Sequence, residues 1–322
     1  MPHTSRRQFI ASAAALALAA PARAQDQAAS ASSSAPPDPQ DAALAARTDD
    51  ESHLTIEVHI NGQGPFRFVV DTGSEQTAIA DNVAQALGLA HGPPVSVDGI
   101  ARRIPADTVQ IAQLQVGPFH HNNLRLPVLP RQYLFADGYL GLDVIDGSRV
   151  TFDFKTHELR IDHSLLETVY NPMEVTKVQV YGSSGRLRAG DCTVDGVSAS
   201  AFLDSGAEVS VGNEALKTAL MKRNPALADL GPLSLSGVTG GQITGRIVPL
   251  KMIQLQDLRF TDCTLVIADV PNFGTWSLER NPALLIGMDF LRQFNSVTID
   301  YRAKEIRFDL AGITPPFTNR RV

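Results

Sequence analysis

The sequence contains only two cysteines, Cys192 and Cys263, among its 322 residues. No histidine stands beside either of them in the chain, so a thiol nucleophile or a zinc site receives little support. Two interpretations of the pair stay open. An oxidising compartment would allow a disulfide between them, and otherwise they are two free, buried thiols.

The chain also lacks a cluster of basic residues. Lys and Arg number 28 against 34 Asp and Glu, which gives a formal net charge of −6 at pH 7. Nucleic-acid-binding domains usually carry clustered Lys and Arg on a basic surface. The composition therefore indicates that the partner is not a nucleic acid.

Long hydrophobic runs are missing after the first segment. No apolar stretch there reaches the roughly 18 to 20 residues that cross a bilayer, so we expect no transmembrane segment. Residues 1–24 have the pattern of a cleaved signal peptide, with Arg6-Arg7 before an Ala/Leu-rich run and a small-residue cleavage site. The paired arginines are typical of twin-arginine export, with a general secretory signal as the alternative, and either predicts a periplasmic or secreted protein. Residues 25–51 have the composition of a disordered tether.

Metal-binding patterns are incomplete. Asp137, Asp143 and Asp146 lack the spacing and the terminal Glu of an EF-hand. The histidine pairs His120-His121 and His157 with His163 lack a third ligand at metal spacing. We therefore predict no metal and no cofactor.

The chain does contain an internal repeat, which predicts its architecture before any single motif is interpreted. Each copy has an apolar strand that ends in an acidic turn, a short helix, an alternating strand that ends at a Gly, an apolar-Gly segment and a final hairpin. The acidic turns are 68–73 and 202–206, the alternating strands are 95–100 and 233–238, and the later segments are 140–161 and 286–308.

Short strands with two-residue alternation and frequent turns make each copy a small β unit. We therefore predict an all-β protein with two homologous, barrel-like lobes and short helices. The expected boundaries are 52–166 for the N-terminal lobe, 167–177 for a connector, 178–311 for the C-terminal lobe and 312–322 for a tail.

Asp71-Thr72-Gly73 and Asp204-Ser205-Gly206, each followed by its own apolar-Gly segment, resemble the motifs of the aspartic peptidase superfamily of pepsins and retropepsins. The resemblance covers most of residues 52–311. It is nearest to bacterial periplasmic members that carry a retropepsin-like unit twice in one chain. It implies a bilobal pepsin/retropepsin-like fold, catalytic Asp71 and Asp204, a polypeptide substrate, no cofactor, and a monomer because both lobes belong to one chain.

The chemistry gives an independent reason for two acids. Hydrolysis of an amide by water needs a base that takes the water proton and an acid that protonates the carbonyl oxygen and the leaving amine. Two carboxylates about 3 Å apart supply both, because two like charges at that distance do not both ionise and the pair shares one proton.

The neighbours of the two acids have expected supporting roles. Gly73 and Gly206 permit a tight turn where a Cβ would crowd the other lobe. By resemblance, the hydroxyls of Thr72 and Ser205 hydrogen-bond across the lobe interface.

The fourth motif position differs between the copies. Ser74 is expected to donate its hydroxyl to the carboxylate of Asp71, whereas Ala207 offers no such donor to Asp204. A hydrogen bond to the charged form lowers the pKa of a carboxyl. The shared proton is therefore expected on Asp204.

Two glycine-bearing hairpins, at Gly99 and at Gly237, Gly240 and Gly241, are candidates for flaps that close over a peptide. The alternative is that they are ordinary mobile loops. Two other functions also stay open for the whole chain. One is a catalytically inactive protein that binds a peptide in the same cleft, and the other is a scaffold, although a scaffold would not need the acidic motif in both copies.

Overall fold

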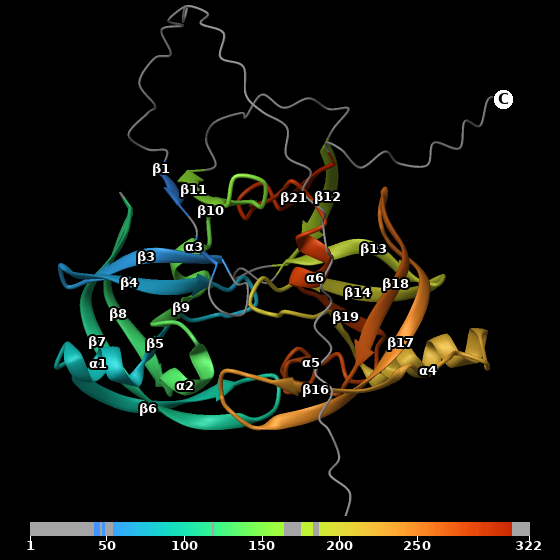
Figure 1. The fold of residues 1–322 in the computed structure, drawn as a ribbon, viewed down its shortest axis with the longest axis horizontal. Coiled ribbons are helices and arrows are strands. Elements are labelled where there is room, and N and C mark those ends of the chain that lie inside the picture. Colours follow the sequence, from blue (N-terminus) through green and yellow to red (C-terminus); the bar gives the residue numbers. More distant parts are fainter. Residues whose placement is uncertain are drawn as a thin grey trace, which may run out of the picture. The chain divides into compact units, whose positions relative to one another are not determined.

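The computed structural model describes residues 42–45, 47–48, 54–117, 119–163, 175–182 and 187–310. These residues form two β-sheets with short helices, so the predicted all-β bilobal fold is confirmed (Figure 1). The predicted signal peptide at 1–24, most of the predicted tether, the predicted connector up to residue 174 and the predicted tail at 312–322 lie outside the described residues.

The N-terminal lobe is built on an eight-stranded sheet with the order β2-β3-β4-β9-β5-β8-β7-β6. An additional pairing of β3 with β7 curls this sheet toward closure. The strands are β2 (Arg47–Thr48), β3 (Leu54–Ile60), β4 (Gln63–Val70), β5 (Ala78–Ala80), β6 (Ala90–Asp98), β7 (Arg103–Val116), β8 (Phe119–Leu129) and β9 (Gly138–Leu140); the helices are α1 (Asp81–Ala86), α2 (Arg131–Leu134) and α3 (Leu142–Ile145).

The C-terminal lobe repeats this arrangement. Its strand β14 pairs in parallel with β19 as β4 does with β9, and β13 pairs with β17 as β3 does with β7. The elements are β12 (Val175–Tyr181), β13 (Arg188–Val194), β14 (Val197–Leu203), β15 (Val211–Gly212), α4 (Glu214–Arg223), β16 (Gly231–Ser236), β17 (Gln242–Leu255), β18 (Leu258–Ile267), α5 (Pro271–Thr275), β19 (Ala283–Ile286) and α6 (Met288–Leu291).

The final hairpins of the two copies join the lobes. Strand β10 (Ser148–Asp153) of the first copy pairs antiparallel with β20 (Ser296–Asp300) of the second, and β11 (Glu158–His163) and β21 (Glu305–Asp309) flank this pair. Thr151 faces Thr298 in the register, and their hydroxyl oxygens are 2.9 Å apart. The repeat predicted both hairpins but not that they pair with each other.

The buried pair of Arg149 and Asp300 also crosses this junction, with 3.1 Å between Nε and Oδ2. Strand β1 (Ala42–Ala45) extends the same sheet by pairing with β11. Strands β1 and β2 lie inside the segment 25–51 that was expected to be a tether, so this part of that segment pairs with the sheets.

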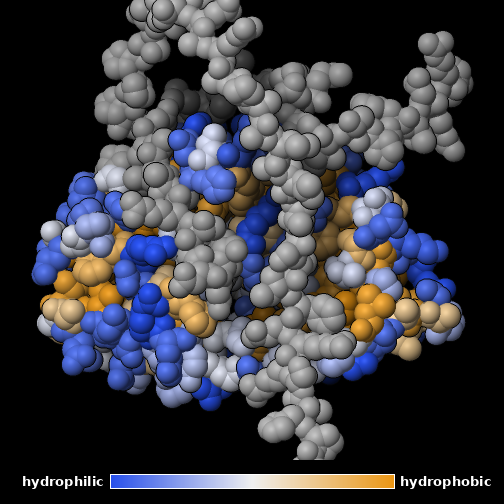
Figure 2. All heavy atoms as spheres, viewed as in Figure 1, coloured by the Kyte–Doolittle hydropathy of each residue, from blue (hydrophilic) through white to orange (hydrophobic). Residues whose placement is uncertain are grey.

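The core explains why the acidic turns lie inside the protein. Strand β4 ends in Phe68, Val69 and Val70, which are fully buried, and β14 ends in the buried Leu203. Burying a side chain such as Phe68 stabilises the fold by roughly 1.5–3 kcal/mol. By contrast β6 is largely exposed, and hydrophilic residues cover its part of the surface in Figure 2. Strands β4 and β14, which precede the acids, are therefore internal, while β6 lies at the periphery.

Candidate active site

Each acid follows directly on an internal strand and is held by the parallel strand beside it. The amide of Asp71 donates to the carbonyl of Leu140 at 3.0 Å, and the amide of Asp204 donates to the carbonyl of Ile286 at 2.9 Å. These carbonyls belong to the two apolar-Gly segments. The segments therefore pack behind the acidic turns.

The two acidic turns interlock. A Cβ added to Gly73 would lie 2.6 Å from Cγ of Asp204, and one added to Gly206 would lie 2.5 Å from Cγ of Asp71. Real Cβ atoms do not approach other atoms so closely, so each glycine makes room for the acid of the other lobe. The expected crowding is present, and it brings the two carboxyl groups within hydrogen-bonding reach of each other.

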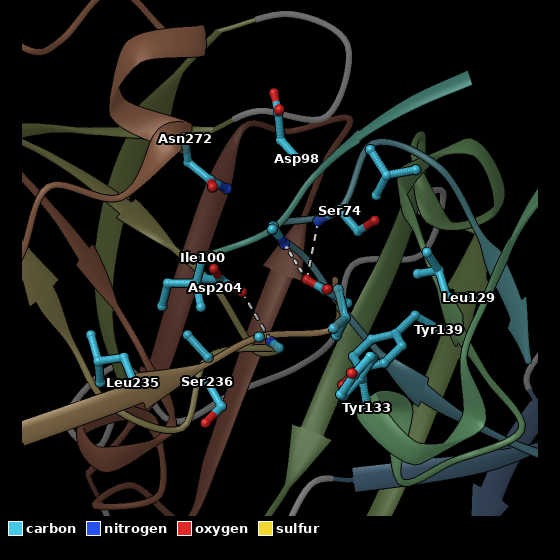
Figure 3. Close-up of a pocket in the computed structure, with 18 of the residues that line it drawn as sticks. Ser74, Asp98, Ile100, Leu129, Tyr133, Tyr139, Asp204, Leu235, Ser236 and Asn272 are labelled. Atoms are coloured by element: carbon cyan, nitrogen blue, oxygen red, sulfur yellow. Dashed lines mark hydrogen bonds between the residues drawn. The ribbon is translucent and has the colours of Figure 1, made fainter. Parts of the chain in front are cut away.

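Backbone amides hold the carboxylates in place (Figure 3). Oδ1 of Asp71 accepts from the amides of Gly73 at 2.9 Å and Ser74 at 3.0 Å, and Oδ1 of Asp204 accepts from Gly206 at 3.0 Å. The hydroxyl of Ser74 donates instead to the carbonyl of Gln76 at 2.8 Å. The expected bond from this hydroxyl to Asp71 is therefore wrong, because Ser74 reaches Asp71 through its amide.

The environment of Asp71 favours the protonated form. Burial, followed by the neighbouring charge of Asp204, raises the pKa of Asp71 to about 8, and the amide of Gly73 offsets part of this rise. A pair of carboxyl groups coupled in this way shares its proton. The expectation that the proton rests on Asp204 loses its basis, since the hydroxyl bond on which it depended is absent.

Hydroxyl groups lock the two turns together across the lobes. The amide of Thr72 donates to Oγ of Ser205 at 3.1 Å, and the amide of Ser205 donates to Oγ1 of Thr72 at 3.0 Å. The hydroxyl of Ser205 donates to the carbonyl of Val70 at 2.8 Å, and the hydroxyl of Thr72 donates to the carbonyl of Leu203 at 3.3 Å. These are the cross-lobe bonds that the resemblance implies, and both side chains are buried.

A second pair of carboxylates supports the turns from behind, and the sequence analysis missed its role. In the N-terminal lobe Oδ1 of Asp143 accepts from the hydroxyl of Thr77 at 2.6 Å and from its amide at 2.8 Å. In the C-terminal lobe Asp289 accepts from the hydroxyl of Ser210 at 2.7 Å and from its amide at 3.0 Å. Burial raises the pKa of both carboxyl groups.

The signal for these carboxylates was in the repeat. Thr77 and Ser210 each lie six residues after their acid, and Asp143 and Asp289 each lie two residues after the Gly of their apolar-Gly segment. The sequence pattern singles out Asp143 only as part of an incomplete cation site. Among the residues that the structure describes, no group of three or more His, Cys, Asp or Glu side chains is placed to hold a metal ion.

A cleft with a volume of about 1100 Å³ lies over the acids. Asp71 and Asp204 line it together with the glycine-bearing hairpins, so the structure brings Gly99, Gly237, Gly240 and Gly241 into the same cavity as the acidic turns.

We call residues 99–102 the first hairpin loop and residues 237–241 the second. They touch each other: Nε of Arg102 donates to the carbonyl of Thr239 at 3.0 Å, and the hydroxyl of Thr239 donates to the carbonyl of Arg102 at 2.8 Å. The loops therefore meet over the cleft.

The base of the first hairpin also contacts helix α5 of the opposite lobe. Arg103 forms an ion pair with Asp98, and its Nη2 donates to the hydroxyl of Thr275 at 3.0 Å. The Thr275 hydroxyl in turn donates to Oδ2 of Asp98 at 2.7 Å. Hydrogen bonding to Arg103 holds the pKa of Asp98 below its ordinary value.

The two cysteines are free thiols. Burial raises the pKa of Cys192 to about 12, so this thiol stays protonated near neutral pH. Of the two interpretations left open, the structure shows the one without a disulfide.

This geometry is that of two retropepsin-like repeats in one chain. A family model described as Aspartyl protease matches residues 56–144 and again residues 190–290. The two matched segments together cover more than half of the sequence, and the chain belongs to this family. The search of curated proteins finds no match. No helix in the described part of the chain has the length and apolarity to span a bilayer.

Proposed function

We propose that this protein is an endopeptidase that hydrolyses polypeptides with a water molecule activated between Asp71 and Asp204. The observation that supports this most strongly is the interlocking of the two acidic turns at the floor of the cleft. Because the pKa of Asp71 is raised, the pair keeps one proton near neutral pH. One carboxyl can therefore act as acid while the other acts as base.

The hairpin loops complete the proposed site. Their contact through Arg102 and Thr239 covers the cleft, and we assign them the role of flaps that open to admit a peptide and close to exclude water. An extended peptide suits such a cleft, because its backbone pairs with the walls while alternate side chains enter pockets.

The test is cleavage of a mixed peptide library by the protein without residues 1–24, with products read by mass spectrometry. Asp71→Asn and Asp204→Asn should each remove nearly all of the rate while the protein remains folded. If either variant keeps more than a few per cent of the rate, the two-acid mechanism is rejected. Peptide binding without cleavage by the wild type would favour the alternative, an inactive peptide-binding protein.

We also propose export to the periplasm through a twin-arginine signal, supported by Arg6-Arg7 and the segment that follows. Replacement of both arginines by lysine should trap unprocessed precursor in the cytoplasm. Normal processing of this variant would indicate the general secretory route. Because one chain supplies both acids, we propose that the monomer is active, and activity should track the monomer peak in size-exclusion chromatography.

A further inference from the structure

The two halves of the cleft differ in chemistry at positions that the repeat makes equivalent. The fourth residue of the acidic motif is Ser74 in the first copy and Ala207 in the second. The sixth is Gln76 in the first copy and Val209 in the second. All four line the same cavity.

A third matched position also has a polar group in the first copy and an apolar one in the second. Tyr139 pairs with Val69 in β4, two residues before Asp71, and Leu285 pairs with Phe202 in β14, two residues before Asp204. Both side chains line the cavity. A phenol in the N-terminal lobe therefore occupies the place that an isobutyl group takes in the C-terminal lobe.

The C-terminal half is part of a continuous apolar cluster. Leu285 and Leu235 are buried in it, and Val209, Leu233 and Trp276 pack against them and line the cleft. The ring of Trp276 lies 4.9 Å from that of Phe202. Ile100 of the first hairpin loop packs on the same cluster from the opposite lobe. Together these side chains make an apolar wall with an apolar cover.

The N-terminal half presents polar groups beside apolar ones. Leu129 lines this half, but so do Gln132 and the phenol-bearing Tyr133 and Tyr139. Figure 3 shows Tyr133, Tyr139 and Leu129 on one side of the acids and Leu235 with Ile100 on the other. Polar residues also line the cleft on the apolar side, among them Asn272, Ser236 and Glu208.

We propose that the cleft has two-sided specificity. It selects a polypeptide with a bulky apolar side chain on one side of the scissile bond and a polar, hydrogen-bonding side chain on the other. Gln76 and Val209 are the matched specificity-determining residues. The proposal rests on the proposed peptidase function, because it assigns the pockets of that same site.

The physical reason is that the two halves penalise the wrong side chain differently. A polar side chain in the apolar half loses its hydrogen bonds with water and gains few in return. An apolar side chain in the polar half gives the amide of Gln76 and the phenol of Tyr133 no hydrogen-bond partner, which costs binding. A peptide therefore binds best in one direction.

The experiment uses a peptide library randomised at two positions on each side of the cleaved bond. The wild type should select polar residues on one side and bulky apolar residues on the other. Gln76→Val should lower the selection for polar residues about tenfold on its own side only. Val209→Gln should lower the selection for apolar residues by a similar factor on the opposite side. If Val209→Gln does not fold, Val209→Thr makes the same test with nearly unchanged shape.

Selection of one chemical class on both sides by the wild type would overturn the proposal. So would a variant that changes both sides equally. The Asp204→Asn variant, which should bind peptides without cleaving them, tests the two-sided cleft independently of the proposed peptidase function. If the wild type cleaves nothing, the peptidase assignment fails, and the affinities of this variant for mixed and uniform peptides still decide whether the cleft is two-sided.

Discussion

The raised pKa of Asp71 links folding to proton uptake at the dyad. The folded protein holds this proton with a pKa of about 8, whereas the ordinary value of an Asp is 3.8. Between these values folding takes up a proton, so stability is greatest at the acidic end and falls as the pH rises. For one proton the slope is about 1.4 kcal/mol per pH unit. The fall ends near pH 8, where the folded pair itself loses the proton.

Asp71→Asn removes this dependence without removing the local hydrogen bonds, since an amide oxygen still accepts from the amides of Gly73 and Ser74. The variant should match the wild type in stability near pH 4. It should then gain up to about 1.4 kcal/mol on the wild type with each pH unit toward pH 8. In thermal unfolding each kcal/mol corresponds to about 2–4 °C for a protein of similar size. Activity should be absent at every pH.

Asp204→Asn is the matched control, because it removes the neighbouring charge but leaves the burial of Asp71. Burial is the larger cause of the raised pKa. The pKa of Asp71 in the folded variant should therefore be lower than in the wild type but still above its ordinary value. The upper end of the pH interval over which stability falls should move to lower pH. Urea unfolding from pH 4 to pH 9 measures the free energy of unfolding of the wild type and of both variants. A stability difference between Asp71→Asn and the wild type that stays constant with pH would refute the shared, buried proton.

Three further predictions concern the surroundings of the dyad. Thr72→Val should destabilise the protein by about 1–3 kcal/mol, because buried groups lose their partners across the lobes, and Thr72→Ser should restore most of the stability in thermal unfolding. Asp289→Ala should cost a similar amount, and Asp143→Ala should do the same in the other lobe; an unchanged melting temperature would show that these carboxylates do not support the turns. Thr275→Val should speed hydrogen exchange in residues 98–103 with little change in global stability, since it removes the hydrogen bonds that tie the exposed ion pair of Arg103 and Asp98 to helix α5.

The sequence was sufficient for the parts of the site that follow from the repeat. Two acidic turns at matched positions predict two acids that meet, and this in turn predicts glycine where each turn approaches the other lobe. Gly73 and Gly206 have this contact. The cross-lobe bonds of Thr72 and Ser205 were available only through the resemblance, because no local pattern states which lobe a hydroxyl faces.

Other features depend on choices that a local pattern does not contain. The hydroxyl of Ser74 donates to the carbonyl of Gln76, and this choice of acceptor depends on a side-chain torsion that a sequence pattern does not specify. The pairing of β10 with β20 joins residues almost 150 positions apart. The alternation of apolar and polar residues identifies a strand, but it does not identify the strands that pair with it on either side.

Comparison of the two copies separates two kinds of position in the cleft. Gly73 and Gly206 each touch the acid of the other lobe, so the interlocking geometry requires the same residue in both copies. Gln76 and Val209 line the cleft at equivalent positions, and they differ in polarity. In a dimer of identical chains the two would have to be the same residue. A single chain with both copies removes this constraint, and we propose that the positions that diverge while facing the cavity determine the substrate specificity.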